Sequence, residues 1–145
     1  MQSFHHELVP KITRVLETAL YVDDLEESVR FYEGVMGLNA MSREDRLVAL
    51  DAGGGTVLLL FRRGATSAGA SFSGGRIPPH DGVGPAHFAF AISAEDLDLW
   101  RTHLARGDVE IESEVKWDRG GVSLYFRDPD GHSVELATPG VWQVY

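Results

Sequence analysis

An internal repeat constrains the fold of this chain more than any other feature of its sequence. Several residues of the first half have a counterpart 70 positions later, and further along each unit the spacing becomes 77 positions. The matched pairs are Glu17 and His87, Val22 and Ile92, Asp23 and Ser93, Gly37 and Gly107, then Asp51 and Asp128, Thr56 and Ser133, and Leu58 and Glu135. Because 145 residues make one ordinary domain, the repeat predicts two small copies of one unit that share a core.

Each unit is predicted to contain a strand, a helix and three further strands. In the first unit, Asp23 or Asp24 can cap a helix on which apolar residues recur at helical spacing, and Gly37 is suited to end it. In the second unit, Ser93 caps the helix and Gly107 ends it. In the first unit the predicted strands cover 12–22, 38–42, 46–50 and 56–61. In the second unit one strand begins at 87, the helix covers 94–106, and the other strands cover 109–116, 122–127 and 133–138.

The remaining segments divide the chain. Residues 1–11 and 140–145 are predicted to be terminal tails around one domain at 12–139, in which 12–61 form the first module and 85–139 the second. Residues 62–84 between the modules are rich in Gly, Ser, Ala and Pro, so they form either a linker or a functional lid. Arg76, His80 and Asp81 in this segment could reach over a pocket.

Composition excludes several classes of protein. A formal charge of −9 argues against a nucleic-acid partner, whose phosphates need a basic surface. The chain has no cysteine, and therefore no disulfide framework, thiolate ligand or cysteine nucleophile. No run of about 18 apolar residues could span a membrane, and the first residues do not resemble a secretory signal. A cytoplasmic location is the default expectation.

Three polar residues stand at related positions of predicted strands. Side chains alternate between the two faces of a strand, and in each module the more apolar face should pack under the helix. The other faces would then line a shared cup that contains Glu17, His87 and Glu135, with Leu58 and Leu60 making one side of it apolar. This set suits an open site for Mn, Fe, Ni, Co or Zn. The competing interpretation is a histidine satisfied in the core and glutamates facing solvent.

The remaining histidines are less favoured as ligands. His103 lies beside the apolar stripe of the second helix and His132 in a turn, so both are expected to be exposed to solvent. The turn itself, Asp128-Pro129-Asp130-Gly131-His132, is a strong turn signal.

The residues before and after this turn carry a family resemblance. The segment Tyr125-Phe126-Arg127-Asp128-Pro129-Asp130-Gly131-His132-Ser133-Val134-Glu135-Leu136, together with Val22-Asp23-Asp24-Leu25 and Arg30-Phe31-Tyr32, resembles the vicinal oxygen chelate superfamily. This group contains glyoxalase I, extradiol dioxygenases, fosfomycin-resistance enzymes and bleomycin-resistance proteins. The resemblance covers 12–139.

The resemblance implies an α+β fold in which two βαβββ modules form an incomplete β-barrel around a divalent metal. The family's ligands map onto Glu17, His87 and Glu135, and Glu135 is also the candidate proton carrier. The sequence departs from the family pattern twice. Extradiol dioxygenases and fosfomycin-resistance enzymes usually have histidine where this chain has Glu17, and glyoxalase I has glutamate where this chain has Leu58.

Three functions are compatible with these residues. The favoured one is a metal-dependent enzyme that chelates two vicinal oxygens of a small substrate and stabilises an enolate or oxyanion. The second is a metal-free binding protein of the bleomycin-resistance kind, in which Tyr21 and Tyr125 stack on the ligand. The third is an iron(II) extradiol dioxygenase. Tyr21, Leu58, Leu60, Arg76, His80 and Tyr125 are the predicted substrate-binding residues, and a homodimer is expected because the tail at 141–145 is apolar.

Overall fold

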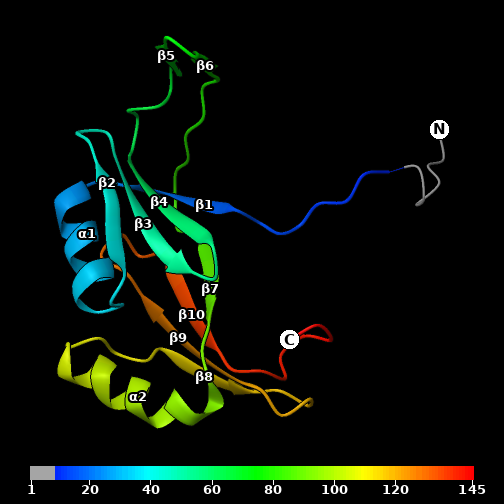
Figure 1. Cartoon of the computed structure of the whole chain (residues 1–145). Coiled ribbons are helices and arrows are strands. Elements are labelled where there is room, and N and C mark those ends of the chain that lie inside the picture. Colours follow the sequence, from blue (N-terminus) through cyan, green and yellow to red (C-terminus); the bar gives the residue numbers. More distant parts are fainter. Residues whose placement is uncertain (1–8) are drawn as a thin grey trace.

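Two modules with the same order of elements make up the protein, whose computed structural model describes residues 9–145 (Figure 1). Predictions for residues 1–8 lie outside the described part. Module one contains β1 (Glu17–Val22), α1 (Leu25–Gly34), β2 (Asn39–Arg43), β3 (Leu47–Gly53) and β4 (Thr56–Arg62). Module two contains β7 (His87–Ala91), a 3₁₀ turn at Ala94–Asp96, α2 (Leu97–Arg106), β8 (Ser113–Lys116), β9 (Val122–Arg127) and β10 (Ser133–Ala137). The predicted α+β fold is confirmed.

The two four-stranded sheets have the same topology. Their strand orders are β1-β4-β3-β2 and β7-β10-β9-β8, so the first strand of each module is an edge strand that pairs in parallel with the last. All other pairs are antiparallel. Since neither sheet closes on itself, no closed barrel forms. The first and last strands of each module lie side by side, and this pairing places their side chains in common rows.

The helices begin and end at the polar signals in the sequence. The Asp24 carboxylate accepts a hydrogen bond from the Glu27 amide at 3.1 Å, and Ser93 caps the second helical segment in the same way. Gly37, with a φ of 73°, follows the first helix in the left-handed conformation that glycine adopts easily. The second helix ends at Gly107 as predicted, and the residue after it, Asp108, is left-handed with a φ of 57°.

One hydrophobic core joins the helix-covered faces of both sheets. Leu20 of β1, Leu60 of β4, Leu104 of α2 and Leu136 of β10 are all at most 1% exposed and belong to one cluster. Leu58, also 1% exposed, lies in the same core. The prediction that Leu58 and Leu60 face the cup was therefore wrong, because both occupy the face of β4 that packs under the helix.

The strand pairing gives the correct repeat spacing. Glu17 lies opposite Val57 in module one, and His87 lies opposite Ser133 in module two. The last strands therefore match at a spacing of 76 positions, one less than the sequence suggested. A shift of one residue moves every side chain to the other face, so Leu59 rather than Leu58 is the counterpart of Glu135.

The segment between the modules folds back onto module one. It contains a short hairpin, β5 (Ala70–Phe72) and β6 (Gly75–Ile77), that projects from one end of the molecule in Figure 1. The return limb passes so close to β1 that a β-carbon on Gly82 would lie 2.6 Å from the Tyr21 ring. This close approach requires glycine at position 82 and fixes the limb against the face of the sheet.

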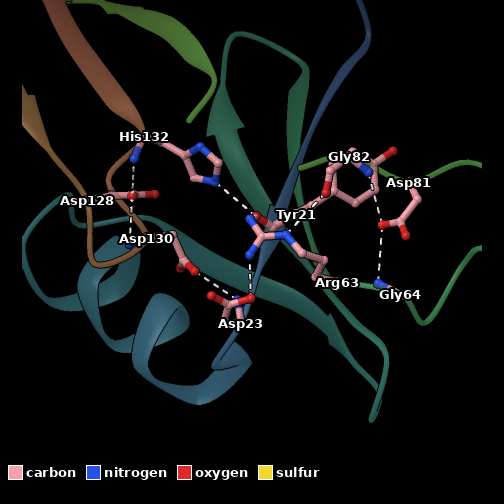
Figure 2. A network of polar contacts seen from close by, with 9 residues as sticks. All are labelled: Tyr21, Asp23, Arg63, Gly64, Asp81, Gly82, Asp128, Asp130 and His132. Carbon is pink, nitrogen blue, oxygen red and sulfur yellow. Dashed lines mark hydrogen bonds and ion pairs between the residues drawn. The ribbon is translucent and has the colours of Figure 1, made fainter. Parts of the chain in front are cut away.

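The turn at 128–132, which we call the clasp, fastens module two to module one (Figure 2). The His132 ring is 1% exposed. Its Nδ1 accepts a hydrogen bond from the Ala86 amide at 2.8 Å, and its Nε2 donates to the Tyr21 carbonyl at 2.9 Å. An imidazole that accepts at one nitrogen and donates at the other is neutral. His132 is thus a buried structural residue, and the prediction of solvent exposure was wrong.

Asp128 is the second anchor of the clasp. Its carboxylate accepts hydrogen bonds from the amides of His132 and Asp130, at 2.9 and 3.0 Å, and from the Tyr32 hydroxyl of α1 at 2.7 Å. Burial, and next the negative charge of Asp128, raise the pKa of the Tyr32 hydroxyl. Asp130 accepts from the Asp23 amide at 2.8 Å. The clasp therefore binds both the end of β1 and the first helix.

Arg63 continues this network towards the segment between the modules. In Figure 2 its guanidinium lies among Asp23, Tyr21 and Gly82. It pairs with the Asp23 carboxylate and donates to the carbonyls of Tyr21 and Gly82 at 3.1 and 3.2 Å. The end of β1 is thus held from both sides.

Within residues 9–145 there is no helix with the length and apolarity needed to cross a membrane.

Candidate metal site

The cup face of each sheet is the face turned away from its helix. In module one it consists of Glu17, Ala19, Tyr21, Leu47, Ala49, Asp51, Val57, Leu59 and Phe61, which the strand pairing places in rows. In module two it consists of His87, Ala89, Ala91, Ser123, Tyr125, Arg127, Ser133, Glu135 and Ala137. All the predicted ligands lie on these faces.

Two of the three predicted ligands meet on the cup face of module two. The Nε2 atom of His87 lies 3.3 Å from Oε1 of Glu135. The His87 side chain is 52% exposed, whereas that of Glu135 is 9% exposed. A buried carboxylate beside an accessible imidazole leaves one open side, from which an ion or a substrate could approach.

The groups around this pair fix the orientation of both side chains. Nδ1 of His87 lies 3.0 Å from the Ser133 carbonyl, which can only accept, so this nitrogen carries a proton, and Nε2, which faces Glu135, is the nitrogen that a metal would bind. Oε2 of Glu135 accepts a hydrogen bond from the Ser123 hydroxyl at 2.5 Å. Ser123 in turn accepts from the Trp117 indole N–H at 2.9 Å.

The geometry of the pair fits a divalent metal. Two ligand atoms that are each about 2.1 Å from an ion lie about 3.0–3.4 Å apart in octahedral or tetrahedral coordination, and the observed separation is 3.3 Å. Metal-bound histidines usually donate their other N–H to a carbonyl or carboxylate, as His87 does. The His87–Glu135 pair could therefore supply two ligands.

Glu17 does not join this pair. It lies at the start of β1 on the cup face of module one and is exposed to solvent. Among residues 9–145, no three His, Asp or Glu side chains are grouped closely enough to hold a metal ion. The chain brings together His87 and Glu135 but not the complete set.

Tyr125, one of the predicted substrate-binding residues, lies next to the His87–Glu135 pair. Its ring stacks on the His87 ring with centroids 6.1 Å apart. Burial, and next the charge of Glu135, raise the pKa of the Tyr125 hydroxyl, which therefore stays protonated at neutral pH. Tyr125 can donate a hydrogen bond to a ligand or to Glu135.

Tyr21 and His80 also meet, but on module one. The Tyr21 hydroxyl lies 2.6 Å from Nδ1 of His80, and the His80 ring packs edge-on against Phe61 at 4.7 Å. Arg76 lies on the projecting hairpin and donates to the Ala68 carbonyl at 3.2 Å. His80 therefore packs on the cup face, whereas Arg76 contacts Ala68, just before its own hairpin.

Sequence reasoning missed Ser123 and Trp117. Ser123 is two residues from Tyr125 on a predicted strand, so alternation already placed it on the cup face, but a serine alone gave no signal. Trp117 lies in the hairpin loop before β9, and nothing in the sequence indicated that its indole reaches Ser123.

Comparison with known proteins identifies the family. The model of the Glyoxalase/Bleomycin resistance protein/Dioxygenase superfamily matches residues 14–136. The chain is 31% identical to glutathione transferase FosA of Serratia marcescens over 117 residues, which are 81% of this chain and 74% of that protein. It is also 31% identical to metallothiol transferase FosB of Bacillus licheniformis over 133 residues, which are 91% and 79% of the two chains.

A solved structure agrees with this assignment. The crystal structure of a lactoylglutathione lyase from Agrobacterium tumefaciens superposes with a TM-score of 0.83 at 33% identity, covering 92% of this chain and 99% of that one. The chain therefore belongs to the Glyoxalase/Bleomycin resistance protein/Dioxygenase superfamily, as the sequence resemblance implied.

Proposed function

We propose that this protein is a metal-dependent enzyme that chelates two vicinal oxygens of a small substrate. The observation that carries the proposal is the His87–Glu135 pair, 3.3 Å apart, with the remaining polar atom of each side chain already hydrogen-bonded to protein. A histidine held only for core packing would be buried, whereas the His87 side chain is 52% exposed and its Nε2 faces a carboxylate. The acidic surface argues against a nucleic-acid partner.

The residues around the pair have separate roles in this proposal. A bound divalent ion would supply Lewis-acid stabilisation of negative charge on a substrate oxygen. His87 and Glu135 would hold the ion, and Ser123 would keep the carboxylate from rotating. Glu135 is the candidate proton carrier, and the protonated Tyr125 hydroxyl is placed to donate a hydrogen bond to the substrate.

We propose that a second copy of the chain completes the site with Glu17. β1 and β7 are both edge strands with one unpaired side. The segment before β1 extends away from the body in Figure 1 and exposes apolar side chains, with Ile12 90% and Val15 74% exposed. Trp142 in the C-terminal tail is 71% exposed. A homodimer would cover these surfaces and could bring Glu17 of one copy to the pair of the other.

The names of the relatives suggest the first substrates to test. FosA is a glutathione transferase, FosB a metallothiol transferase, and the superposed structure a lactoylglutathione lyase. All three names refer to a thiol or its adduct. We therefore propose a thiol such as glutathione as a cosubstrate, with a small oxygenated compound as the acceptor.

Calorimetric titration of Mn²⁺, Ni²⁺ and Zn²⁺ into metal-free protein tests the metal site. His87→Ala and Glu135→Ala should each lower affinity at least tenfold, because each removes a ligand from a site that has few. His103→Ala and Glu95→Gln are matched controls on exposed positions away from the pair and should bind as the wild type does. Unchanged affinity in both site variants would reject the metal proposal.

Subunit mixing tests the contribution of Glu17. Glu17→Ala and His87→Ala should each impair metal binding alone. If the ligands come from different copies, a mixed dimer of the two variants regains one intact site, so mixing should restore about a quarter of the wild-type sites by random pairing. No recovery in a mixture that has demonstrably exchanged subunits would place all ligands in one copy.

A further inference from the structure

We infer that the cavity between the inter-module segment and the cup face of module one binds the distal end of the substrate, and that this end is an apolar body terminating in a carboxylate. The inference rests on the proposed function for its orientation, since Glu17 forms one wall of the cavity. The cavity itself is a property of module one and can be tested without metal.

The cavity has an apolar interior and a volume suited to a small ligand. Its volume is about 230 Å³, below the range of about 300–1,000 Å³ typical of sites for drug-sized molecules. Leu47, Leu59 and Phe61 of the sheet form its floor, while Ile77 and Pro78 cover it from above. An apolar group buried here would be removed from water on both sides.

Charged groups occupy the two ends of this cavity. Glu17 and Tyr21 stand four residues apart on β1, which is about 13 Å at the usual rise of a strand. Leu47 and Phe61 lie in the row of Tyr21, and Arg46 immediately precedes Leu47. The cavity therefore runs from the candidate ligand Glu17 to a guanidinium. A substrate whose oxygens are chelated at the first end would direct its other end towards Arg46.

Arg46 is available to bind an anion. Its only ion-pair partner among the described residues is Glu44, at 3.9 Å, and the two side chains are 42% and 54% exposed. Such a long, solvated pair contributes little stability. A carboxylate at the mouth of an apolar cavity would give the guanidinium a stronger, bidentate partner.

His80 supplies a polar contact in the middle of the cavity. Thr66 binds the His80 backbone twice, through its own carbonyl and through its hydroxyl. Tyr21 occupies Nδ1 of the ring at 2.6 Å. When the Tyr21 hydroxyl donates, the neutral ring carries its proton on Nε2, which becomes a donor for an oxygen of the bound molecule. The Tyr21–His80 pair is thus a positioning element for the ligand.

The first experiment uses 3-phenylpropanoate, which has the apolar body and the carboxylate but no vicinal oxygens. Titrated into metal-free protein and followed by methyl NMR, it should shift the signals of Leu47, Leu59 and Ile77. Arg46→Gln should weaken binding at least fivefold, and so should replacing the carboxylate by its amide. Arg30→Gln, an exposed arginine on α1, is the matched control and should bind as the wild type does.

A second variant removes the space instead of the charge. Ala70 lines the cavity from the hairpin, so Ala70→Leu should fill it and abolish the methyl shifts without changing the melting temperature. Shifts confined to other parts of the molecule, equal affinity in Arg46→Gln, or unimpaired binding in Ala70→Leu would each overturn the inference.

A third measurement separates the cavity from the metal site. In manganese-loaded protein, 3-(3,4-dihydroxyphenyl)propanoate should bind at least tenfold more tightly than 3-phenylpropanoate, and His87→Ala should remove only this gain. Arg46-dependent binding of both probes without any gain from metal supports the cavity and rejects the proposed function. A metal-dependent gain in affinity, with binding of both probes unchanged in Arg46→Gln, supports the proposed function and rejects the cavity.

Discussion

The cup faces of the two modules have the same backbone but opposite chemistry. Module two places polar groups where module one has aliphatic ones, and small residues where module one has aromatic rings. At the 76-residue spacing of the later strands the counterparts are Ser123 and Leu47, Tyr125 and Ala49, Glu135 and Leu59, and Ala137 and Phe61; at the 70-residue spacing of the first strands they are Ala91 and Tyr21. Only the first position of each module, Glu17 or His87, offers a metal-ligating side chain in both.

This difference shows how the two copies of a duplicated unit can take different roles. The polar face holds a carboxylate and an imidazole in fixed orientations, which requires hydrogen-bonding neighbours. The apolar face is covered by the segment between the modules and encloses a cavity instead. Since both faces use the same strands, the division depends on side chains at alternate positions and leaves the helix-covered core unchanged.

The largest expected difference is between glutamate substitutions at two adjacent positions of β4, Leu58 and Leu59. Leu58→Glu should unfold the protein, because an unpaired carboxylate in the core costs more than about 5 kcal/mol. Leu59→Glu should fold, because this partly exposed side chain lies on the cup face, and it would give module one the counterpart of Glu135. Thermal unfolding with and without Zn²⁺ measures both. Equal damage from the two substitutions would contradict the 76-residue spacing.

His132→Ala should cost about 4 kcal/mol of unfolding free energy, because it removes a buried ring and the hydrogen-bond partners of two backbone groups. His132 joins the turn of module two to Tyr21 of module one, so its loss should weaken the contact between the modules first. The β3–β4 turn of module one has no such residue. Chemical denaturation gives the free energy, and hydrogen exchange shows whether the end of β1 loses protection first. Glu95→Gln, at an exposed site of module two, should change stability by less than about 1 kcal/mol.

Tyr32→Phe should cost about 2 kcal/mol at neutral pH by removing a hydrogen bond to the buried Asp128 carboxylate. The folded-state pKa of Tyr32 lies above the ordinary value of 10.0. The stabilisation is therefore complete below about pH 10 and is lost as pH rises further, by about 1.4 kcal/mol per unit. Urea denaturation of both proteins from pH 8 to 11 should show the difference narrowing above pH 10. A constant difference would mean that Tyr32 ionises normally.

Ser123→Ala should weaken metal binding about tenfold while the melting temperature changes little, because the hydroxyl orients Glu135 without being a ligand. Leu47→Ala, the same position of module one, is the control and should leave metal affinity unchanged. Calorimetry of both variants decides the matter. Equal affinities in Ser123→Ala and wild type would show that Glu135 is held by its burial alone.

The sequence predicted the order of elements because the signals for it are local. Asp24, Ser93 and Gly37 act within one turn of helix, and apolar residues alternate along each strand. The short hairpin at 70–77 was missed because its residues have no periodicity. The spacing of the last strands was one residue off because Asp51 was matched with Asp128 by residue type, whereas strand pairing places Asp51 opposite Val57 and Arg127 opposite Ser133.

The candidate site was predictable in part for a related reason. His87, Glu135 and Tyr125 lie on neighbouring strands of one sheet, so alternation along each strand was enough to place them together. Glu17 belongs to the other module, whose position depends on the clasp and the shared core. The buried state of His132 followed from contacts with residues 46 and 111 positions away, which no local pattern encodes.

The clasp also determines when module one can complete its native contacts during protein synthesis. Its hydrogen bonds join residues 96 to 111 positions apart. At about 5–20 residues per second, a ribosome needs roughly 5–20 s to make the chain between them. Throughout that time the hydroxyl of Tyr32 lacks its final partner, the carbonyl of Tyr21 has only the Arg63 guanidinium, and the apolar face of module one stays uncovered. We therefore expect the nascent first module to remain a client of chaperones until the final strands emerge.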